Sequence, residues 1–208
     1  QADSLNKKFV RVNAGIFSGQ FSLVPASVNE ENLKPLFENI FQLNNRDSAT
    51  LQFDRIRELD ASVVYPIPAA LVNNMQQRFQ SVSFTHTIAA YLRHFAAYNE
   101  GTTVYAVLLS GYVQLFCLSG KKLLFSNSFR VKSSDDFIYY VLAVFQTLNL
   151  SKDETPLALY GEIVSDSNLY QSANKYVRTV SAGKTIGHWK FEDDYPFPAH
   201  FYSTLYSL

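Results

Sequence analysis

Residues 103–131 read TVYAVLLSGYVQLFCLSGKKLLFSNSFRV, and this stretch decides the fold class of the protein. It holds three runs of β-branched, aromatic and aliphatic residues, separated by Ser110-Gly111 and by Ser119-Gly120. Serine-glycine dipeptides between apolar runs are typical of hairpin turns, because glycine adopts a positive φ without steric cost. The stretch therefore predicts three strands that pair antiparallel in succession.

A helix is expected directly after these strands. Ser133 and Asp136 have the spacing of a capping box, and apolar residues then recur every three or four positions. Asp135 and Asp136 lie at the helix start, where unpaired N–H groups stabilise carboxylates, so capping explains them without catalysis. The remaining predicted elements are a strand at 157–160, a helix at 167–180, a strand at 185–191 and a short helix from Pro198.

The first half of the chain predicts a similar order of strands and helices, except that the first elements of this order are missing. Residues 8–12 and 20–24 alternate apolar and polar side chains around a turn that contains glycine, which predicts a hairpin. The other predicted elements are helices at 29–43 and 69–79, a helix that starts at Thr85 or Thr87 and ends at residue 98, and strands at 51–56, 61–65 and 81–84. The repeat indicates a duplicated mixed α/β unit, with one lobe at 1–100 and the other at 101–208.

Charge and cysteine content limit the function classes. Eighteen basic residues balance eighteen acidic ones, so we expect neither nucleic-acid binding nor attraction to an anionic membrane. Cys117 is the one cysteine, which excludes an intrachain disulfide and favours a cytoplasmic location. The apolar run at 104–118 is shorter than the roughly 20 residues of a spanning helix, so no membrane insertion is predicted. Because the chain opens on Gln1, we expect that residues upstream have been removed or left out.

Common catalytic signatures are absent from the sequence, which has no Walker A loop, no G-x-G-x-x-G and no G-x-S-x-G. His86 and His94 lie eight residues apart on one predicted helix, too far to share a metal ion, and we interpret them as capping or surface residues. His188 and His200 flank the acidic run at 192–194, which we interpret as a solvated loop; the alternative is a carboxylate-imidazole site. We therefore expect no catalytic and no metal-ligating residues.

The segment 195–202, YPFPAHFY, gathers aromatic residues and prolines outside any clean periodicity. We expect it to seal an edge of the core. The alternative is a surface that binds a partner protein, and its residues to test would be Trp189, Tyr195, Phe197 and Phe201.

Several stretches resemble a bacterial family known as domain of unknown function 3822. They are FSLVPASVNEENL (21–33), VVYPIPAALVNNMQQRF (63–79), FRVKSSDDFIYYVLAVFQTLNL (129–150) and LALYGEI (157–163). The resemblance covers nearly the whole chain from Phe9 to about Trp189 and includes no catalytic signature. It implies a duplicated, ribonuclease-H-like fold with two lobes, similar to actin-like ATPases and closest in layout to their pilus-assembly members. It also implies a strand hairpin upstream of Gln1.

The resemblance implies where a nucleotide would bind. In actin-like ATPases each half opens on a hairpin with an Asp for Mg²⁺-bound water and a Gly for phosphate. The matching turn here, Leu109-Ser110-Gly111, keeps the glycine and has no acid. The adenosine motif of that fold ends a strand with two glycines, and here Gly161-Glu162 keeps one. Ser110, Gly111, Gly161 and Glu162 are thus the candidate cofactor-binding residues.

Two function classes follow. The first is a non-catalytic actin-like protein with a degenerate nucleotide site and no cofactor, which acts in the cytoplasm by binding another protein. The alternative is an ATP-binding switch with Mg²⁺, related to pilus-assembly ATPases, whose upstream hairpin supplies the missing phosphate contacts. A third hypothesis is an enzyme that uses a cleft between the lobes together with His188.

Overall fold

The computed structural model describes residues 9–41, 49–184 and 198–206. The chain divides into two compact units, one of residues 1–90 with residue 208 and one of residues 91–207. The division falls inside helix α3 (Thr87–Tyr98), whereas the sequence places the boundary between the lobes after residue 100. Strands and helices alternate in both units, so the protein has the mixed α/β fold that the sequence predicts.

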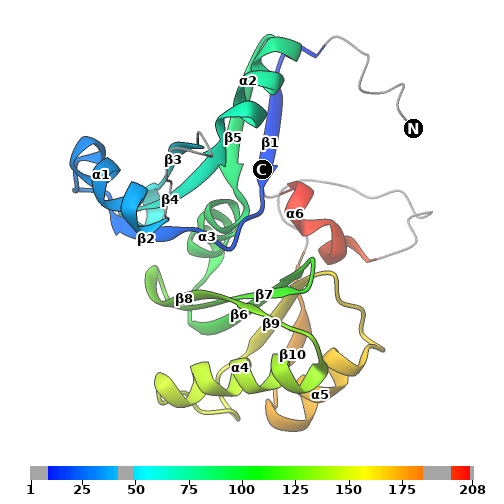
Figure 1. Ribbon diagram of the computed structural model, residues 1–208. Coiled ribbons are helices and arrows are strands. Elements are labelled where there is room, and N and C mark those ends of the chain that lie inside the picture. The colour runs from blue at the N-terminus through cyan, green and yellow to red at the C-terminus, as the bar shows by residue number, and fades with distance from the viewer. Residues whose placement is uncertain (1–8, 42–48, 185–197, 207–208) are drawn as a thin grey trace. The chain divides into compact units, whose positions relative to one another are not determined.

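The second unit is built on a five-stranded mixed sheet with the strand order β10-β9-β6-β7-β8 (Figure 1). Its strands are β6 (Thr102–Leu109), β7 (Tyr112–Ser119), β8 (Lys122–Arg130), β9 (Leu157–Gly161) and β10 (Val180–Ala182). β6, β7 and β8 pair antiparallel in succession, which confirms the three predicted strands. β9 pairs parallel with β6, and β10 pairs parallel with β9.

The turn between β6 and β7 has the conformation that its sequence predicts. Leu109 pairs with Tyr112, so Ser110 and Gly111 are the two turn residues. Their φ angles are 50° and 76°, and positive φ at both positions defines a type I′ turn. This turn type follows the right-handed twist of paired strands, which is why it fixes the register of β6 against β7.

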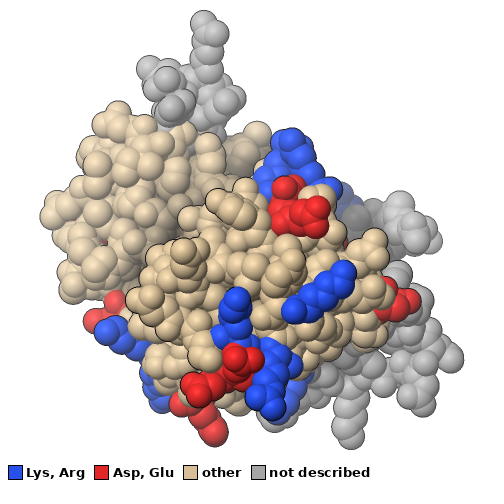
Figure 2. Space-filling view, turned by 90° about the horizontal axis from the view of Figure 1, so that it is seen from below, with Lys and Arg blue, Asp and Glu red and all other residues tan. Residues whose placement is uncertain are grey.

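Helices α4 (Ser134–Thr147) and α5 (Asn168–Tyr176) cover one face of this sheet (Figure 1). The core beneath them joins strand residues such as Val104 and Leu115 to Val141 and Phe145 of α4, none more than 2% exposed. Figure 2 views the molecule from this side and shows Lys and Arg side chains close to Asp and Glu side chains, with wide uncharged areas between them. The described part of this face therefore carries no extended field of one sign.

The start of α4 carries the predicted capping box. Ser133 Oγ accepts a hydrogen bond from the Asp136 N–H (3.1 Å), and Asp136 Oδ2 accepts one from the Lys132 N–H (2.9 Å). The two side chains satisfy backbone donors that the helix leaves unpaired. Capping and the favourable position of acids in a first turn account for Asp135 and Asp136, as predicted.

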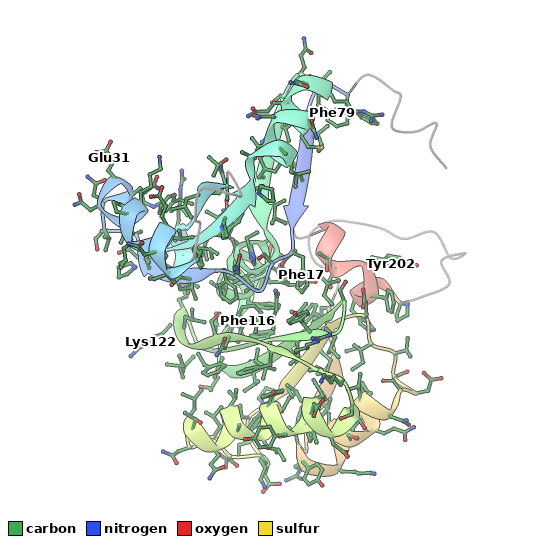
Figure 3. The ribbon with its side chains drawn as sticks, in the orientation of Figure 1. Phe17, Glu31, Phe79, Phe116, Lys122 and Tyr202 are labelled. Carbon is green, nitrogen blue, oxygen red and sulfur yellow. The ribbon has the colours of Figure 1, made fainter. Side chains whose placement is uncertain are left out.

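The opposite face of the sheet is aromatic. Phe95 of α3 stacks on Tyr105, with ring centroids 4.0 Å apart, and meets the ring of Phe116 edge-on at 5.7 Å. Phe116, labelled in Figure 3, lies on the side of the sheet that faces away from α4 and α5. The alternation along β6 and β7 thus buries aliphatic side chains against the helices and aromatic side chains on the other face.

The C-terminal elements η3 (Ala199–Tyr202) and α6 (Ser203–Tyr206) lie beside β9. The Tyr91 hydroxyl hydrogen-bonds Ser203 Oγ (2.7 Å), and His200 Nε2 donates to the Ile163 carbonyl (2.8 Å). Residues 198–202 of the segment expected to seal the core therefore lie against the sheet, while its residues 195–197 fall outside the described residues.

The prediction for the end of the second unit was wrong in its boundaries. The helix expected at 167–180 ends at Tyr176, because Val177 adopts extended angles (φ −116°, ψ 126°). Val180 then pairs with Leu157 as the first residue of β10. The strand expected at 185–191 lies outside the described residues.

The first unit contains two small sheets. Their strands are β1 (Val12–Ile16), β2 (Ser22–Pro25), β3 (Ala49–Ile56), β4 (Ala61–Pro68) and β5 (Val82–His86), with helices α1 (Glu30–Ile40), η2 (Arg57–Leu59) and α2 (Ala69–Arg78). β1 pairs parallel with β5, and β2 and β3 pair antiparallel with β4 on either side. The hairpin predicted at residues 8–24 is therefore wrong, because its two strands belong to different sheets.

A small core fixes α1 on the three-stranded sheet. Phe37 and Phe41 of the helix region pack with Leu51 of β3 and Val64 of β4, all buried. Asn29 Oδ1 accepts the Glu31 N–H (2.9 Å) and caps the helix. Among the described residues no helix is long and apolar enough to cross a membrane.

Candidate functional site

The structure brings the four predicted site residues together at one edge of the five-stranded sheet. Ser110 and Gly111 form the turn after β6, while Gly161 ends β9 and Glu162 follows it. β6 and β9 are parallel neighbours, and their register places Leu108 opposite Gly161. Because the carboxyl ends of parallel strands lie at the same edge of a sheet, both motifs meet there.

Gly161 is required by the packing of β9 on β6. Its φ is +81°, and a Cβ atom at this position would overlap the carbonyl oxygen of Leu108. The close approach lets the Glu162 N–H donate to the Leu108 carbonyl (2.8 Å). The surviving glycine of the predicted adenosine motif thus has a structural role of its own.

Glu162 reaches back to the turn. Its Oε2 accepts a hydrogen bond from the backbone N–H of Ser110 at 3.0 Å. The N–H of a turn residue with positive φ is the kind of donor that binds an anion in phosphate-binding loops. In this protein the Ser110 N–H is instead hydrogen-bonded to the Glu162 carboxylate of the same chain.

A shallow pocket of about 320 Å³ adjoins these residues. It is lined by Leu108, Leu109, Gly111, Tyr112, Val131, Lys132, Ser133, Ser134, Glu162 and Leu169. Glu162 is the one acid among them and Lys132 the one base. Within the described ranges, no three His, Cys, Asp or Glu side chains gather closely enough to hold a metal ion.

The start of α4 lies at the same pocket through Ser133 and Ser134. A helix start attracts anions because its first N–H groups are unpaired and the helix dipole is positive there. Here Asp135 and Asp136 already occupy the first turn, and Ser133 Oγ takes the Asp136 N–H. The Ser133 hydroxyl therefore satisfies one N–H of this helix start, and the two acids already place negative charge there.

None of the described histidines lines this pocket. His86 ends β5 in the first unit and is not on the helix predicted to carry it, which corrects that expectation. His94 is on α3, and His200 binds the Ile163 carbonyl one residue after Glu162. His188, Trp189, Tyr195 and Phe197 lie outside the described residues. Phe201 of η3 contacts the ring of Tyr202 edge-on, with centroids 5.8 Å apart.

Sequence reasoning missed two interactions at this site. The Glu162–Ser110 hydrogen bond and the His200–Ile163 hydrogen bond join residues far apart in the chain, and neither carries a local signal. The four predicted site residues could be identified because the glycines of the two motifs are a local sequence signal. The contact between the motifs depends on which strands are neighbours.

Comparisons with known proteins agree with this architecture. The family model described as "Protein of unknown function (DUF3822)" matches residues 1–180. One similar crystal structure comes from Bacteroides thetaiotaomicron VPI-5482 and is described as a protein with actin-like ATPase fold and unknown function. It matches with a TM-score of 0.75 and 20% sequence identity, and the match covers 87% of this chain and 71% of that chain. At this identity the likeness shows the fold alone.

Two more distant structures also match. An AlfA filament bound to AMPPNP gives a TM-score of 0.44 at 11% identity, covering 98% of this chain and 61% of that chain. Apo psk41 ParM gives 0.40 at 12% identity, covering 99% and 64%. Both likenesses are too weak to support an argument about function. No curated protein matches the sequence.

Proposed function

The chain belongs to the family of proteins of unknown function DUF3822 and has an actin-like ATPase fold, and from this premise we propose that it is a non-catalytic member of that fold that acts by binding another protein. The observation that carries the proposal is the hydrogen bond from the Ser110 N–H to Glu162 Oε2. It places a negative charge of the chain where a nucleotide would have to place a phosphate.

The electrostatics of the turn oppose a polyanion. A phosphate at the Ser110 N–H would have to displace the Glu162 carboxylate and would then lie beside it. Like charges at such a distance repel, and the lost hydrogen bond adds to the cost of binding. Leu109 and Ser110 stand where the fold's Asp would hold Mg²⁺-bound water, so the turn residues themselves supply no carboxylate for that bridge to phosphate.

A calorimetric titration with Mg²⁺-ATP tests the loss of the nucleotide site. We expect no micromolar binding and no turnover for the wild type. Glu162→Gln removes the charge and is expected to raise any residual affinity, whereas Glu154→Gln, at an exposed acid in a loop of the same unit, should change nothing. Micromolar binding with turnover by the wild type would overturn the proposal in favour of the ATP-binding switch.

The protein-binding role is supported by an apolar surface on α1. Leu36 and Ile40 are 52% and 54% exposed, and they lie one turn apart on α1. Exposed aliphatic side chains that are neighbours on one helix face are characteristic of surfaces that contact another protein. We propose the cytoplasm as the location, because Cys117 is free and buried.

Affinity purification with quantitative mass spectrometry tests this role. We expect a specific protein to be enriched with the wild type and lost with the Leu36→Lys, Ile40→Lys double variant. Leu71→Lys is the matched control, because Leu71 is an exposed leucine on α2 of the same unit. A protein captured equally by all three forms, or no specific protein, would contradict the assignment of α1 as the binding surface.

A further inference from the structure

We propose that the second unit has a separate binding site for a small planar aromatic compound that carries one acidic group. The site is a pocket of about 700 Å³ on the aromatic face of the five-stranded sheet, which is a volume typical of small-molecule pockets. It is lined by His94, Phe95, Tyr98, Thr103, Tyr105, Pro156, Ala158, Tyr160, Ser181, Ala182, Gly183 and Lys184. No part of the proposed function assigns a role to it.

The pocket lies on the aromatic face of the sheet, whereas the pocket beside the Ser110–Glu162 turn is lined by Ser133 and Ser134 at the start of α4. The pocket on the aromatic face takes Thr103 and Tyr105 from the start of β6, whereas the turn follows Leu109 at the end of the same strand. The six steps from Thr103 to Leu109 span about 20 Å at the rise of a β-strand. Tyr160 of this pocket precedes Gly161 in the chain, but the two pockets share no lining residue.

The walls of the pocket are rings in fixed positions. Phe95 and Tyr105 stack with an interplanar angle of 13°, and Phe95 also contacts Tyr160 with centroids 5.1 Å apart. The Tyr105 hydroxyl donates to Asn99 Oδ1 (2.9 Å), which holds that ring in place. Because these rings are already ordered, contact with an aromatic ligand costs little further side-chain entropy.

Gly183 keeps one side of the pocket close to an aromatic ring. A Cβ atom at this position would overlap the Tyr160 ring, so only glycine lets the chain after β10 pass over that ring. Burial raises the pKa of Tyr160 to about 12, so its hydroxyl stays protonated and can donate a hydrogen bond. The pocket thus combines an apolar wall with a neutral donor.

The charge of the lining selects the ligand class. Among the described residues, the lining contains no Asp and no Glu, and its one formal charge is the ammonium of Lys184, which is exposed. Burial lowers the pKa of His94, so its imidazole adds no positive charge at neutral pH. An aromatic acid can stack on the rings and place its carboxylate beside Lys184, whereas an aromatic cation would meet that ammonium.

Three matched probes test both the site and the ligand class: 2-naphthoate, neutral 2-naphthamide and trimethyl(2-naphthyl)ammonium. We expect 2-naphthoate to bind the wild-type chain by calorimetry with a dissociation constant of about 0.1–1 mM. The amide should bind more weakly and the cation most weakly. Lys184→Gln should weaken naphthoate roughly two- to fivefold and leave the amide unchanged, because an exposed ion pair contributes that much. Lys175→Gln, on α5 and outside the pocket, is the control.

Two substitutions that fill the pocket test the location. Ala158→Leu adds bulk from β9, and Ser181→Phe adds bulk from an exposed position that the fold does not depend on. Each substitution should weaken the binding of 2-naphthoate and of 2-naphthamide about tenfold or more. The circular dichroism spectrum and the thermal unfolding of each variant should stay close to those of the wild type. No saturable binding of naphthoate by the wild type, unchanged binding by the Ser181→Phe variant, or tighter binding of the cation than of the acid would each overturn the proposal.

Discussion

The Asp54 carboxylate accepts the backbone N–H of His86 at 2.6 Å inside the first unit. Asp54 lies on β3 and His86 ends β5, so the hydrogen bond joins the three-stranded sheet to the β1–β5 pair. Both residues are buried, at 8% and 0% exposure. A short hydrogen bond between a charged acceptor and a buried donor is worth more than an ordinary one, and the stability of the first unit should depend on it.

Replacing Asp54 should destabilise the first unit. Asp54→Ala leaves the buried His86 N–H without this acceptor, at a cost of about 1–3 kcal/mol in the free energy of unfolding. Asp54→Asn keeps an oxygen of similar shape and should cost less. Urea unfolding followed by circular dichroism measures both, with Glu38→Ala as the control, because Glu38 is exposed on α1 of the same unit. Equal effects of Ala and Asn would contradict a specific role for the acceptor.

Acid should destabilise the protein through His86. Its Nδ1 accepts the Ile88 N–H (3.2 Å) and its Nε2 lies 3.1 Å from the Ser18 carbonyl, so the neutral ring suits both neighbours. Burial lowers the pKa of His86 from 6.5 to about 4, against a smaller opposing effect of the Ser18 hydrogen bond. Between these two pH values the unfolded chain binds a proton that the folded chain does not. The free energy of unfolding should therefore fall by up to about 3 kcal/mol as the pH drops from 6.5 to 4, with no further loss below.

Unfolding experiments at a series of pH values check this dependence. Because other groups also titrate, the quantity to follow is the difference between wild type and His86→Gln. That difference should shrink as the pH falls through the window and become constant below it. A difference that is independent of pH would show that the imidazole is not held neutral in the folded state.

The fold was predictable where the signals are local. Ser110-Gly111 and Gly120-Lys121 form the turns between neighbouring strands, so the order β6-β7-β8 follows from adjacent residues. The partner of β1 was not predictable in this way. Its alternation of side chains indicates a strand but not a partner, and the structure pairs it with β5, where Ser83 Oγ donates to Asn13 Oδ1 across a separation of 70 residues.

Alanine substitutions should separate the two glycines of the candidate site. Gly111 and Gly161 both have positive φ, 76° and 81°, so each alanine pays roughly 1 kcal/mol of backbone strain. At Gly111 the nearest atom to an added Cβ is 3.9 Å away, whereas at Gly161 the Cβ would overlap the Leu108 carbonyl. We expect Gly161→Ala to destabilise the protein by about 2–4 kcal/mol in urea unfolding and Gly111→Ala by about 1 kcal/mol. Similar losses at both positions would contradict the close approach of β9 to β6.

The candidate site was predictable only as separate motifs. The glycines of the turn and of the strand end point to special backbone geometry and can be found in a sequence. The interaction that gives the site its character, Glu162 with Ser110, requires β9 to lie next to β6 in parallel register. That neighbour relation comes from packing of the whole sheet, which no short stretch of sequence encodes.

Asn99 should be among the most sensitive polar residues of the second unit, because one buried side chain makes three hydrogen bonds. Its Nδ2 donates to the carbonyls of Gly101 (2.6 Å) and Gly120 (2.7 Å), and its Oδ1 accepts the Tyr105 hydroxyl (2.9 Å). Asn99→Ala removes all three at about 1 kcal/mol each, so the free energy of unfolding should fall by about 3 kcal/mol. Tyr105→Phe removes one bond and should cost about 1 kcal/mol.

The pair of variants also separates stability from ligand binding. Tyr105→Phe keeps a ring stacked on Phe95, so binding of 2-naphthoate should change little in spite of the lost hydrogen bond. Asn99→Ala frees the Tyr105 ring, and the probe should then bind more weakly because the ring must be ordered again on binding. Asn99→Ala could instead lower the free energy of unfolding and leave the naphthoate affinity at the wild-type value. In that case the Asn99–Tyr105 hydrogen bond stabilises the fold but does not organise the pocket.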